Sequence, residues 1–392
     1  MNIPKLRFKE FTDDWKTHKL KNICYINPKS SNLNDKFYYI DLECVQYGRL
    51  KYIQCINKLE APSRAQRVLL PQDILFQSVR AYQKKSYFFK KENDIQTVAS
   101  TGYAQLRTKK ELSLYIYYYL YFQKFINKVN KLSTGTSYPA INSTDLGMIN
   151  INIPSFQEQE KIANFLSTVD KKIENLENTI TSLENQKKGL LQQIFSQKLR
   201  FKDKNGNNYP NWEKKKLGDI TTSYSGGTPS VNVKDYYNGT IPFIKSGEIH
   251  NSFTETFITE TGLNSSSAKL VKKGDLLFAL YGATSGDTSI SKINGAINQA
   301  ILCVRSTTLN LHYLYQLLNF YRNKLLSIYL QGGQGNFSAT IFKNLIFNFP
   351  CLEEQTKIAD FLSAFDRKLE NQKAQLEHWQ QIKKGLLQQM FV

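Results

Sequence analysis

The chain has 392 residues, with 52 Lys and Arg against 33 Asp and Glu, a formal net charge of +19 and a pI near 9.4. This length suits two or three domains, each with its own core. The positive charge and the 13% of aromatic residues favour a polyanionic partner, nucleic acid ahead of an anionic membrane, over a merely soluble basic protein.

Several protein classes are excluded by what the sequence lacks. The five cysteines are odd in number and have no CxxC spacing, which predicts reduced cysteines of a cytoplasmic protein. The first residues carry no apolar segment of a signal peptide, and the most apolar run, 115–122, is too short to span a bilayer. The four histidines are scattered. We therefore expect no membrane association and no metal site.

Residues 1–153 are predicted to form a β-rich globular domain. Short apolar runs broken by Gly, Pro, Asn and Ser predict strands at 36–45, 48–53, 73–82 and 85–89. A tyrosine-rich helix is expected from Glu111 to about Val129, followed by a loop at 133–137. Its aromatic stripe favours a place in the core over a stacking platform for bases.

Residues 154–198 are predicted to form one long helix. Apolar residues recur in alternating steps of four and three from Ile162 to Ile194, which is the a/d seam of a coiled coil. This seam is about 50 Å long. Ser155 and Glu158 have the spacing of a capping box directly after Pro154.

Residues 199–350 are predicted to form a second β-rich domain of the same plan. Strands are expected at 241–249, 275–282 and 297–305, a helix at 309–329, and a Gly- and Gln-rich loop at 331–336. The segment Leu6–Glu10 recurs as Leu199–Asp203, and Asp73-Ile-Leu-Phe matches Asp275-Leu-Leu-Phe. The chain therefore consists of two half-repeats.

Residues 351–392 are predicted to form a second copy of the long helix. Segments 154–195 and 350–391 align without a gap, and about half of their positions are identical. Each apolar seam needs a partner, so we expect the two helices to pair within the chain; pairing with another chain is the alternative. The predicted pairing residues are Leu166, Ile173, Leu176, Ile180, Leu183, Leu190, Leu362, Leu369, Leu376, Trp379 and Leu386.

No catalytic motif holds in this sequence. It has no GxxxxGK[ST] phosphate-binding loop, no GxGxxG after a strand and no Asn/Asp-Pro-Pro-aromatic signature of adenine methyltransferases. The ExK spacing at Glu213–Lys215, which nucleases also use, lies in a lysine-rich link without a strand context. The absences favour a binding and scaffolding role over an enzyme.

Loops of both halves carry groups that bind phosphates and base edges, and glycines that let a backbone approach a phosphate. The candidate DNA-binding residues in the first half are Arg64, Arg67, Arg80, Tyr82, Lys84, Lys85, Thr136, Ser137 and Tyr138. Those in the second half are Gly226, Gly227, Thr228, Lys245, Tyr281, Thr284, Gln299, Gln334 and Asn336.

Together these residues resemble the specificity subunit of a type I restriction-modification enzyme. The most specific parts are the two Lys-Ile-Ala-x-Phe-Leu openings at 161–166 and 357–362, the Lys-Lys-Gly-Leu-Leu-Gln-Gln ends, and the Gly-Gly-Thr-Pro element at 226–229. The first half departs from the pattern at Asn27-Pro28-Lys29-Ser30, where the second half has Gly-Gly-Thr-Pro.

The resemblance implies an α+β fold with two pseudo-symmetric, β-rich target recognition domains, separated by two long antiparallel coiled-coil helices. Each domain would bind one half of a split sequence in double-stranded DNA. The helices would bind two modification subunits, which carry the adenine methylation, and restriction subunits would join them. The chain itself would be non-catalytic and hold no cofactor, with S-adenosylmethionine and ATP on the partner subunits.

Two other functions stay open from the sequence. One is an enzyme with a cryptic nuclease or methyltransferase site, which would act on DNA without partners. The other is a coiled-coil scaffold or membrane-surface protein that binds DNA without sequence preference, with an affinity that depends only on salt.

Overall fold

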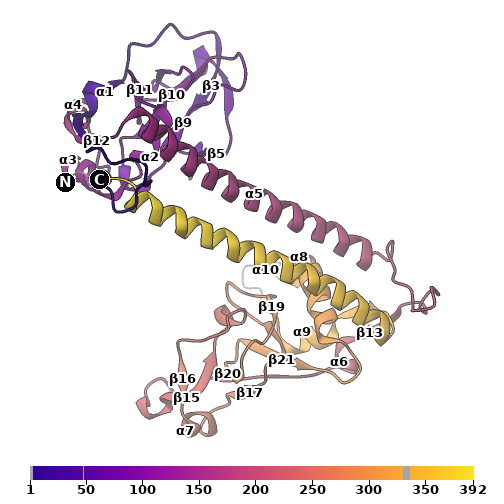
Figure 1. The fold of residues 1–392 in the computed structure, drawn as a ribbon. Helices are drawn as coiled ribbons and strands as arrows, with labels where there is room; N and C mark the ends of the chain where they lie inside the picture. Colours follow the sequence, from indigo (N-terminus) through magenta and orange to yellow (C-terminus); the bar gives the residue numbers. More distant parts are fainter. Residues whose placement is uncertain (1–2, 47, 330–335) are drawn as a thin grey trace. The chain divides into compact units, whose positions relative to one another are not determined.

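The computed structural model describes residues 3–46, 48–329 and 336–392 of the chain (Figure 1). The chain forms two compact units, Met1–Glu177 with Ala374–Val392, and Asn178–Lys373. Among the described residues, each unit contains two four-stranded sheets, one two-stranded sheet and a part of each long helix, and the first unit also contains a short hairpin. The fold class is mixed α and β, as predicted, and the internal repeat of the sequence is a repeat of the fold. The domain boundaries at 153, 198 and 350 stay predictions.

The first unit begins with short strands and ends in the first long helix. One four-stranded sheet has the order β6-β3-β10-β7, with β10 parallel to β3, and another has the antiparallel order β2-β11-β8-β9. Strands β1 and β12 form a separate antiparallel pair, and β4 and β5 form a hairpin. The elements are β1 (Lys16–Lys19), α1 (Leu20–Ile23), β2 (Cys24–Ile26), β3 (Lys36–Ile40), β4 (Val45–Gln46), β5 (Arg49–Leu50), β6 (Gln54–Asn57), η1 (Lys58–Glu60), β7 (Ala65–Val68), β8 (Ile74–Gln77), η2 (Ala81–Gln83), β9 (Tyr87–Phe88), β10 (Thr97–Ser100), β11 (Tyr103–Thr108), α2 (Ser113–Tyr119), α3 (Gln123–Leu132), α4 (Ser143–Met148), β12 (Asn150–Ile153) and α5 (Phe156–Phe195).

The second unit repeats this order except for the β4–β5 hairpin, which has no counterpart among its described residues. Its sheets have the orders β16-β15-β20-β17 and β14-β21-β18-β19, and β13 pairs with β22. As in the first unit, one pair of strands, β15 with β20, is parallel. The elements are β13 (Glu213–Lys216), α6 (Leu217–Ile220), β14 (Thr222–Ser225), η3 (Lys234–Tyr236), β15 (Tyr237–Ile244), η4 (Ser246–Glu248), β16 (Phe257–Ile258), α7 (Glu260–Asn264), β17 (Lys269–Val271), β18 (Leu276–Ala279), β19 (Thr288–Ile290), β20 (Gly295–Ile297), β21 (Ile301–Arg305), α8 (Leu311–Tyr329), α9 (Ala339–Asn344), β22 (Ile346–Phe349) and α10 (Leu352–Gln389).

Side-chain turns shorten two of the predicted strands. The predicted strand at 36–45 ends with β3 because the Asp41 carboxylate accepts hydrogen bonds from the N–H groups of Glu43 and Cys44. The predicted strand at 297–305 is divided into β20 and β21 because Asn298 forms the same kind of turn with the N–H of Ala300. Asx turns of this kind compete with sheet formation over a few residues.

The tyrosine-rich segments lie in the core, as predicted. Tyr115 and Tyr119 in the first unit and Tyr313 in the second are almost fully buried. The single helix predicted from Glu111 to Val129 is instead two helices, α2 and α3, with a break at 120–122. In the second unit the corresponding segment is one helix, α8, close to its predicted bounds.

The two long helices pack together within the chain, which confirms the predicted pairing. In the second unit, Lys187 forms an ion pair with Asp366, and Glu184 lies 2.7 Å from Lys373, so the two helices run antiparallel. The predicted pairing residues follow the seam. Leu166, Ile173, Leu176, Ile180, Leu183, Leu362 and Leu369 are buried, and Leu190, Leu376, Trp379 and Leu386 are half-buried.

Each unit has one polar layer in the helix seam. In the first unit, Lys383 Nζ lies 2.6 Å from Asp170, which also accepts a hydrogen bond from Tyr118 Oη at 2.8 Å. In the second unit, Lys187 pairs with Asp366, which also accepts from Gln316 Nε2 at 2.6 Å. The two lysines that interrupt the apolar heptads are therefore matched by acids on the facing helix.

The predicted capping box at the start of α5 is only half formed. The N–H of Glu158 donates to Ser155 Oγ at 3.3 Å, but the Glu158 carboxylate is buried and binds Arg7 through two contacts of 2.8 Å. The equivalent Glu354 binds Arg200 at 3.1 and 2.6 Å. The reciprocal half of the box was wrong because each carboxylate fixes the segment that precedes its unit's first strand.

Candidate nucleic-acid interface

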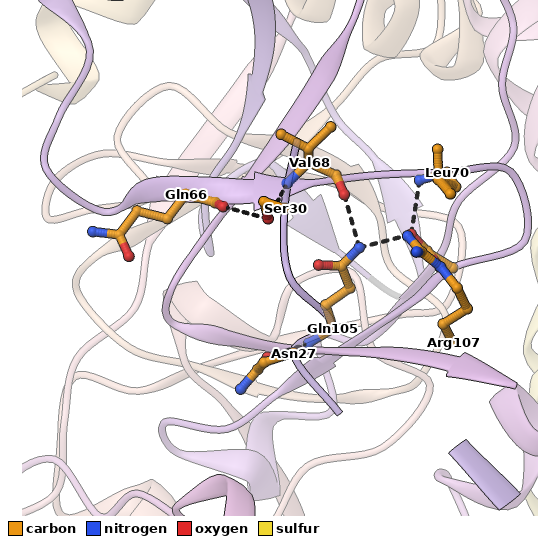
Figure 2. A network of polar contacts seen from close by, with 8 residues as sticks. Asn27, Ser30, Gln66, Val68, Leu70, Gln105 and Arg107 are labelled. Atoms are coloured by element: carbon orange, nitrogen blue, oxygen red, sulfur yellow. Dashed lines mark hydrogen bonds and ion pairs between the residues drawn. The ribbon is translucent and has the colours of Figure 1, made fainter. Parts of the chain in front are cut away.

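A buried polar network supports the loops of the first unit (Figure 2). The Asp73 carboxylate accepts hydrogen bonds from Arg107 Nε at 2.8 Å, from Gln105 Nε2 at 2.7 Å and from the N–H of Leu70 at 2.7 Å. Gln105 Nε2 also donates to the carbonyl of Val68, so the network joins β7, β8 and β11. In the second unit Asp275 and Arg305 form the equivalent pair. These pairs hold the strands of each unit together, while the arginine side chains remain 30% exposed at Arg107 and 40% exposed at Arg305.

The structure brings three of the predicted DNA-binding residues together beyond the end of β8. Arg80 donates from Nε and Nη2 to the carbonyl oxygen of Ser137, at 3.3 and 3.0 Å. Its guanidinium lies over the ring of Tyr138, 4.2 Å from the ring centroid. Tyr138 is 68% exposed. An arginine thus lies on an exposed aromatic ring at the surface, beside the exposed Thr136.

The residues that follow Arg80 differ in their environment. Tyr82 is exposed. Lys84 donates to Gln123 Oε1 at 2.9 Å, and burial together with the nearby Lys384 lowers the pKa of its ammonium group. Lys85 lies 3.6 Å from Glu43 and donates to the carbonyl of Leu42, so its charge is partly matched inside the unit. Arg80 and Tyr82 are the stronger candidates for contact with DNA.

Arg64 and Arg67 belong to a different sheet. Both lie on or beside β7, whereas Arg80 follows β8 of the other four-stranded sheet. Arg64 is exposed. Arg67 is half-buried, and burial lowers the pKa of its guanidinium group. Its Nε is buried and has no hydrogen-bond partner within the described part of the chain.

The glycines at 226 and 227 have a reason inside the protein. Both are buried. A Cβ at Gly226 would lie 1.8 Å from the carbonyl oxygen of Ile297, and one at Gly227 would lie 2.6 Å from Ser267 Cβ. The space beside them is filled by the unit's own chain, which gives both glycines a packing reason, and their contact with DNA stays a prediction.

The remaining candidates of the second unit are spread over several loops. Thr228 donates to Gln299 Oε1 at 2.6 Å, which joins two exposed side chains from different loops. Lys245 and Asn336 are exposed, Tyr281 is half-buried with its pKa raised by burial, and Thr284 has a buried hydroxyl. Gln334 lies outside the described residues.

Across 3–46, 48–329 and 336–392, no helix is both long and apolar enough to cross a membrane. In the same ranges, no group of three or more His, Cys, Asp and Glu side chains is placed to hold a metal ion.

Comparison with known proteins identifies the family. The type I restriction modification DNA specificity domain matches residues 12–185 and 209–378. The specificity subunit of the type I restriction enzyme MjaIX from Methanocaldococcus jannaschii is 30% identical over 50% of this chain and 48% of its own length. The putative MjaX specificity subunit of the same organism is 24% identical over 98% of this chain and 95% of its own length.

Solved structures show the same fold over nearly the whole chain. The S subunit of a type I restriction-modification system from M. genitalium covers 100% of this chain and 99% of its own, with a TM-score of 0.65 and 16% identity. A chain from a study of complex assembly and conformational transition of the type I R-M system covers 95% of this chain and 96% of its own, with a TM-score of 0.59 and 20% identity. With both halves matched by the same domain, the chain belongs to the type I restriction-modification DNA specificity family.

Proposed function

We propose that this chain is the specificity subunit of a type I restriction-modification enzyme, and that each β-rich half binds one part of a bipartite DNA sequence. The observation that carries the proposal is a duplicated fold with unlike loops. The sheet orders of the two units are the same, yet the first unit presents Arg80 on Tyr138 and the second presents Thr228 with Gln299. Two domains that share a fold but expose different polar groups are suited to bind different DNA sequences.

The proposed protein partners are two modification subunits, with restriction subunits completing the enzyme. A duplicated surface at the start of the long helices supports two copies of one partner. Phe8 packs edge-to-face against Phe165 with ring centroids 5.8 Å apart, and Phe201 packs in the same way against Phe361 at 5.5 Å. Equivalent surfaces on the two repeats suit equivalent copies of a single partner. In the first unit this surface is hollowed, and the hollow is lined by Phe8, Gln157, Glu160, Lys161, Asn164, Phe165 and Thr168.

In this proposal the chain recognises DNA and does no chemistry. S-adenosylmethionine and ATP would bind to the partner subunits, and the complex would act in the cytoplasm. The purified chain, incubated with DNA and either S-adenosylmethionine or Mg²⁺, should neither methylate nor cut it. Activity of the chain alone, absent from a preparation with Arg80 and Tyr138 both changed to Ala, would point to an enzyme instead.

The decisive experiment exchanges residues 1–153 for the equivalent segment of a relative with a different target. The exchanged chain is expressed with its partner subunits, and the methylated sites in DNA are mapped by sequencing of modified bases. One part of the bipartite sequence should change while the other stays. A change in both parts, or in neither, would contradict the assignment of one part to each half.

A further inference from the structure

Arg80 occupies a backbone position that the second unit fills with glycine. Ile141 N–H donates to the carbonyl of Ser78 at 3.1 Å, and Phe337 N–H donates to the carbonyl of Leu280 at 2.7 Å. The acceptor of each bond is the first residue after a strand, Ser78 after β8 and Leu280 after β18. Ser78 and Leu280 are therefore equivalent positions of the two units, and so are Arg80 and Gly282, two residues further along. Both residues have left-handed backbones, with φ of 54° at Arg80 and 86° at Gly282.

An arginine in this conformation costs free energy that a glycine does not. A left-handed backbone is unfavourable for residues with a Cβ, and such strain is retained mainly where a site uses it. Within the described part of the chain no ion pair of Arg80 compensates, because its contacts are with the Ser137 carbonyl and the Tyr138 ring. The positive charge of Arg80 is therefore not matched by an acidic side chain among the described residues.

The contacts of Arg80 leave one edge of its guanidinium open. Nε and Nη2 both donate to the Ser137 carbonyl, so they use the side edge of the group. Nη1 makes no hydrogen bond to a described residue, and together with the second hydrogen of Nη2 it forms the end edge. The Tyr138 ring fixes the plane of the group from one face. Nη1 and Nη2 of Arg80 thus form a pair of coplanar hydrogen-bond donors, which the contacts with Ser137 and Tyr138 orient before DNA binds.

We propose that Arg80 recognises a guanine in the part of the target bound by the first unit, by donating from Nη1 and Nη2 to guanine O6 and N7. Guanine is the base that presents two adjacent acceptors in the major groove, and a two-donor arginine matches them. This inference rests on the proposed function and adds a named base to it. A phosphate oxygen pair is the competing ligand, because it also accepts from an arginine fork.

The test combines one change in the protein with one change in the DNA. The target is first defined by sequencing of modified bases, and each guanine of the relevant part is then replaced by 7-deazaguanine, which lacks N7, or by hypoxanthine, which keeps both N7 and O6. For the assembled complex, affinity should fall about 5- to 150-fold at one guanine with 7-deazaguanine and stay unchanged with hypoxanthine.

Arg80→Gly should remove that penalty without harming the fold. Glycine relieves the strained backbone, so the melting temperature should not fall. Arg80→Lys should keep the charge but also lose the discrimination, because ammonium has no planar fork. Lys84→Gly is the matched control, since Lys84 has the same φ of 54° and the same charge. It should leave the 7-deazaguanine penalty intact.

Three outcomes would overturn the inference. One is a target with no guanine in the relevant part. Another is an Arg80→Gly complex whose affinity for DNA falls by the same factor for every sequence and depends less on salt. That result indicates a contact between Arg80 and a phosphate. The third is a clear fall in melting temperature, which indicates a structural role. If the exchange of residues 1–153 still changes one part of the target, the proposed function survives each of these results.

Discussion

The carbonyl oxygen of Ile297 shows how tightly the loops of the second unit are packed. It stands where a side chain at position 226 would have to begin, 1.8 Å from an ideal Cβ. Backbone on both sides leaves little room for relaxation, because a strand cannot move aside as a flexible side chain can. The glycine is therefore required by the fold before any question of DNA binding arises.

Gly226→Ala should destabilise the second unit by about 3 kcal/mol or more, because the β20 backbone must shift. Gly189→Ala is the matched control: it lies within α5, and a Cβ there meets nothing within 4 Å. That change should stabilise the helix by about 0.5–1 kcal/mol. Thermal unfolding of the purified chain compares the two. Equal melting temperatures for the two variants would show that the β20 backbone can shift at little cost in free energy.

A second expected effect concerns pH and the pair Asp275–Arg305. Burial raises the pKa of the Asp275 carboxyl, but hydrogen bonds from Arg305 and the backbone outweigh it, so the pKa lies below the usual 3.8. A depressed pKa adds stability that is present above pH 3.8 and is lost as the pH falls through the folded value. Asp275→Asn should therefore cost about 1–2 kcal/mol at pH 7 and progressively less below pH 3.8.

Urea unfolding of the two proteins between pH 3 and pH 7 measures this difference. Asp219→Asn changes an exposed carboxylate of the same unit and should give little difference at any of these pH values. A gap between wild type and Asp275→Asn that widens toward low pH would contradict the assigned sign.

Single residues were the least predictable part of the interface. The sequence marked Arg80, Ser137 and Tyr138 separately by their chemistry, and the structure joins them. The sequence did not indicate that Asp73 binds Arg107. The two residues are 34 positions apart in the chain and meet only when β8 pairs with β11. The sequence could not show that Gly226 is needed for packing, since a glycine needed for packing and a glycine that approaches a phosphate are the same residue type.

The long helices were the most predictable elements, because a heptad repeat depends only on local spacing. Ile162 to Leu183 are buried at the expected positions. The sequence of one helix could not explain the lysines at seam positions, Lys187 and Lys383, because the acidic residues that pair with them lie on the other helix. Polar groups at seam positions are a known means of setting register. The layers at Asp170–Lys383 and Lys187–Asp366 are placed to do this in each unit.

Lys187→Asp should weaken the helix pair of the second unit by about 1–3 kcal/mol, because two carboxylates then meet in a partly buried seam. Lys187→Asp with Asp366→Lys should recover part of the loss. Recovery stays incomplete because Gln316 donates to Asp366 and cannot donate to an ammonium. Lys188→Asp, at an exposed neighbouring position, is the control. Circular dichroism during heating follows the helices; equal effects at 187 and 188 would rule out a register role.

Strand boundaries were predicted less well than the helices. β7, β10 and β11 were missed because their short apolar stretches lie between polar residues and carry no clear period. Their position depends on partners far along the chain, such as β3 beside β10. The internal repeat can correct such omissions. Because the four-stranded sheets of the two units have the same strand order, a strand identified in one unit predicts a strand at the matching position of the other.

For the molecule as a whole, we expect the long helices to set the distance between the two recognised DNA parts. Seven residues inserted after Glu177, and seven more after Lys373, keep the a/d spacing of both helices. They add about 10 Å to the pair, which corresponds to about three base pairs of DNA. Mapping of methylated sites should show a gap longer by about that number. Insertion of three residues at each place is the control, since it breaks the seam. An unaltered gap after the seven-residue insertion would show that the helices do not set it.

The two ends of the chain lie within the same unit (Figure 1). The N–H of Leu6 donates to the carbonyl of Gln389 at 2.9 Å, and the carbonyl of Val392 accepts from Tyr119 Oη at 2.9 Å. A short linker can thus join the two ends of this sequence, while a new start can be opened at the exposed residues 204–208 between α5 and β13. Such a circular permutation would reverse the order in which the ribosome makes the halves, and it would disrupt only the local turn at Asp203–Asn208. Gene fusions that shuffle halves have a physical route to a folded product.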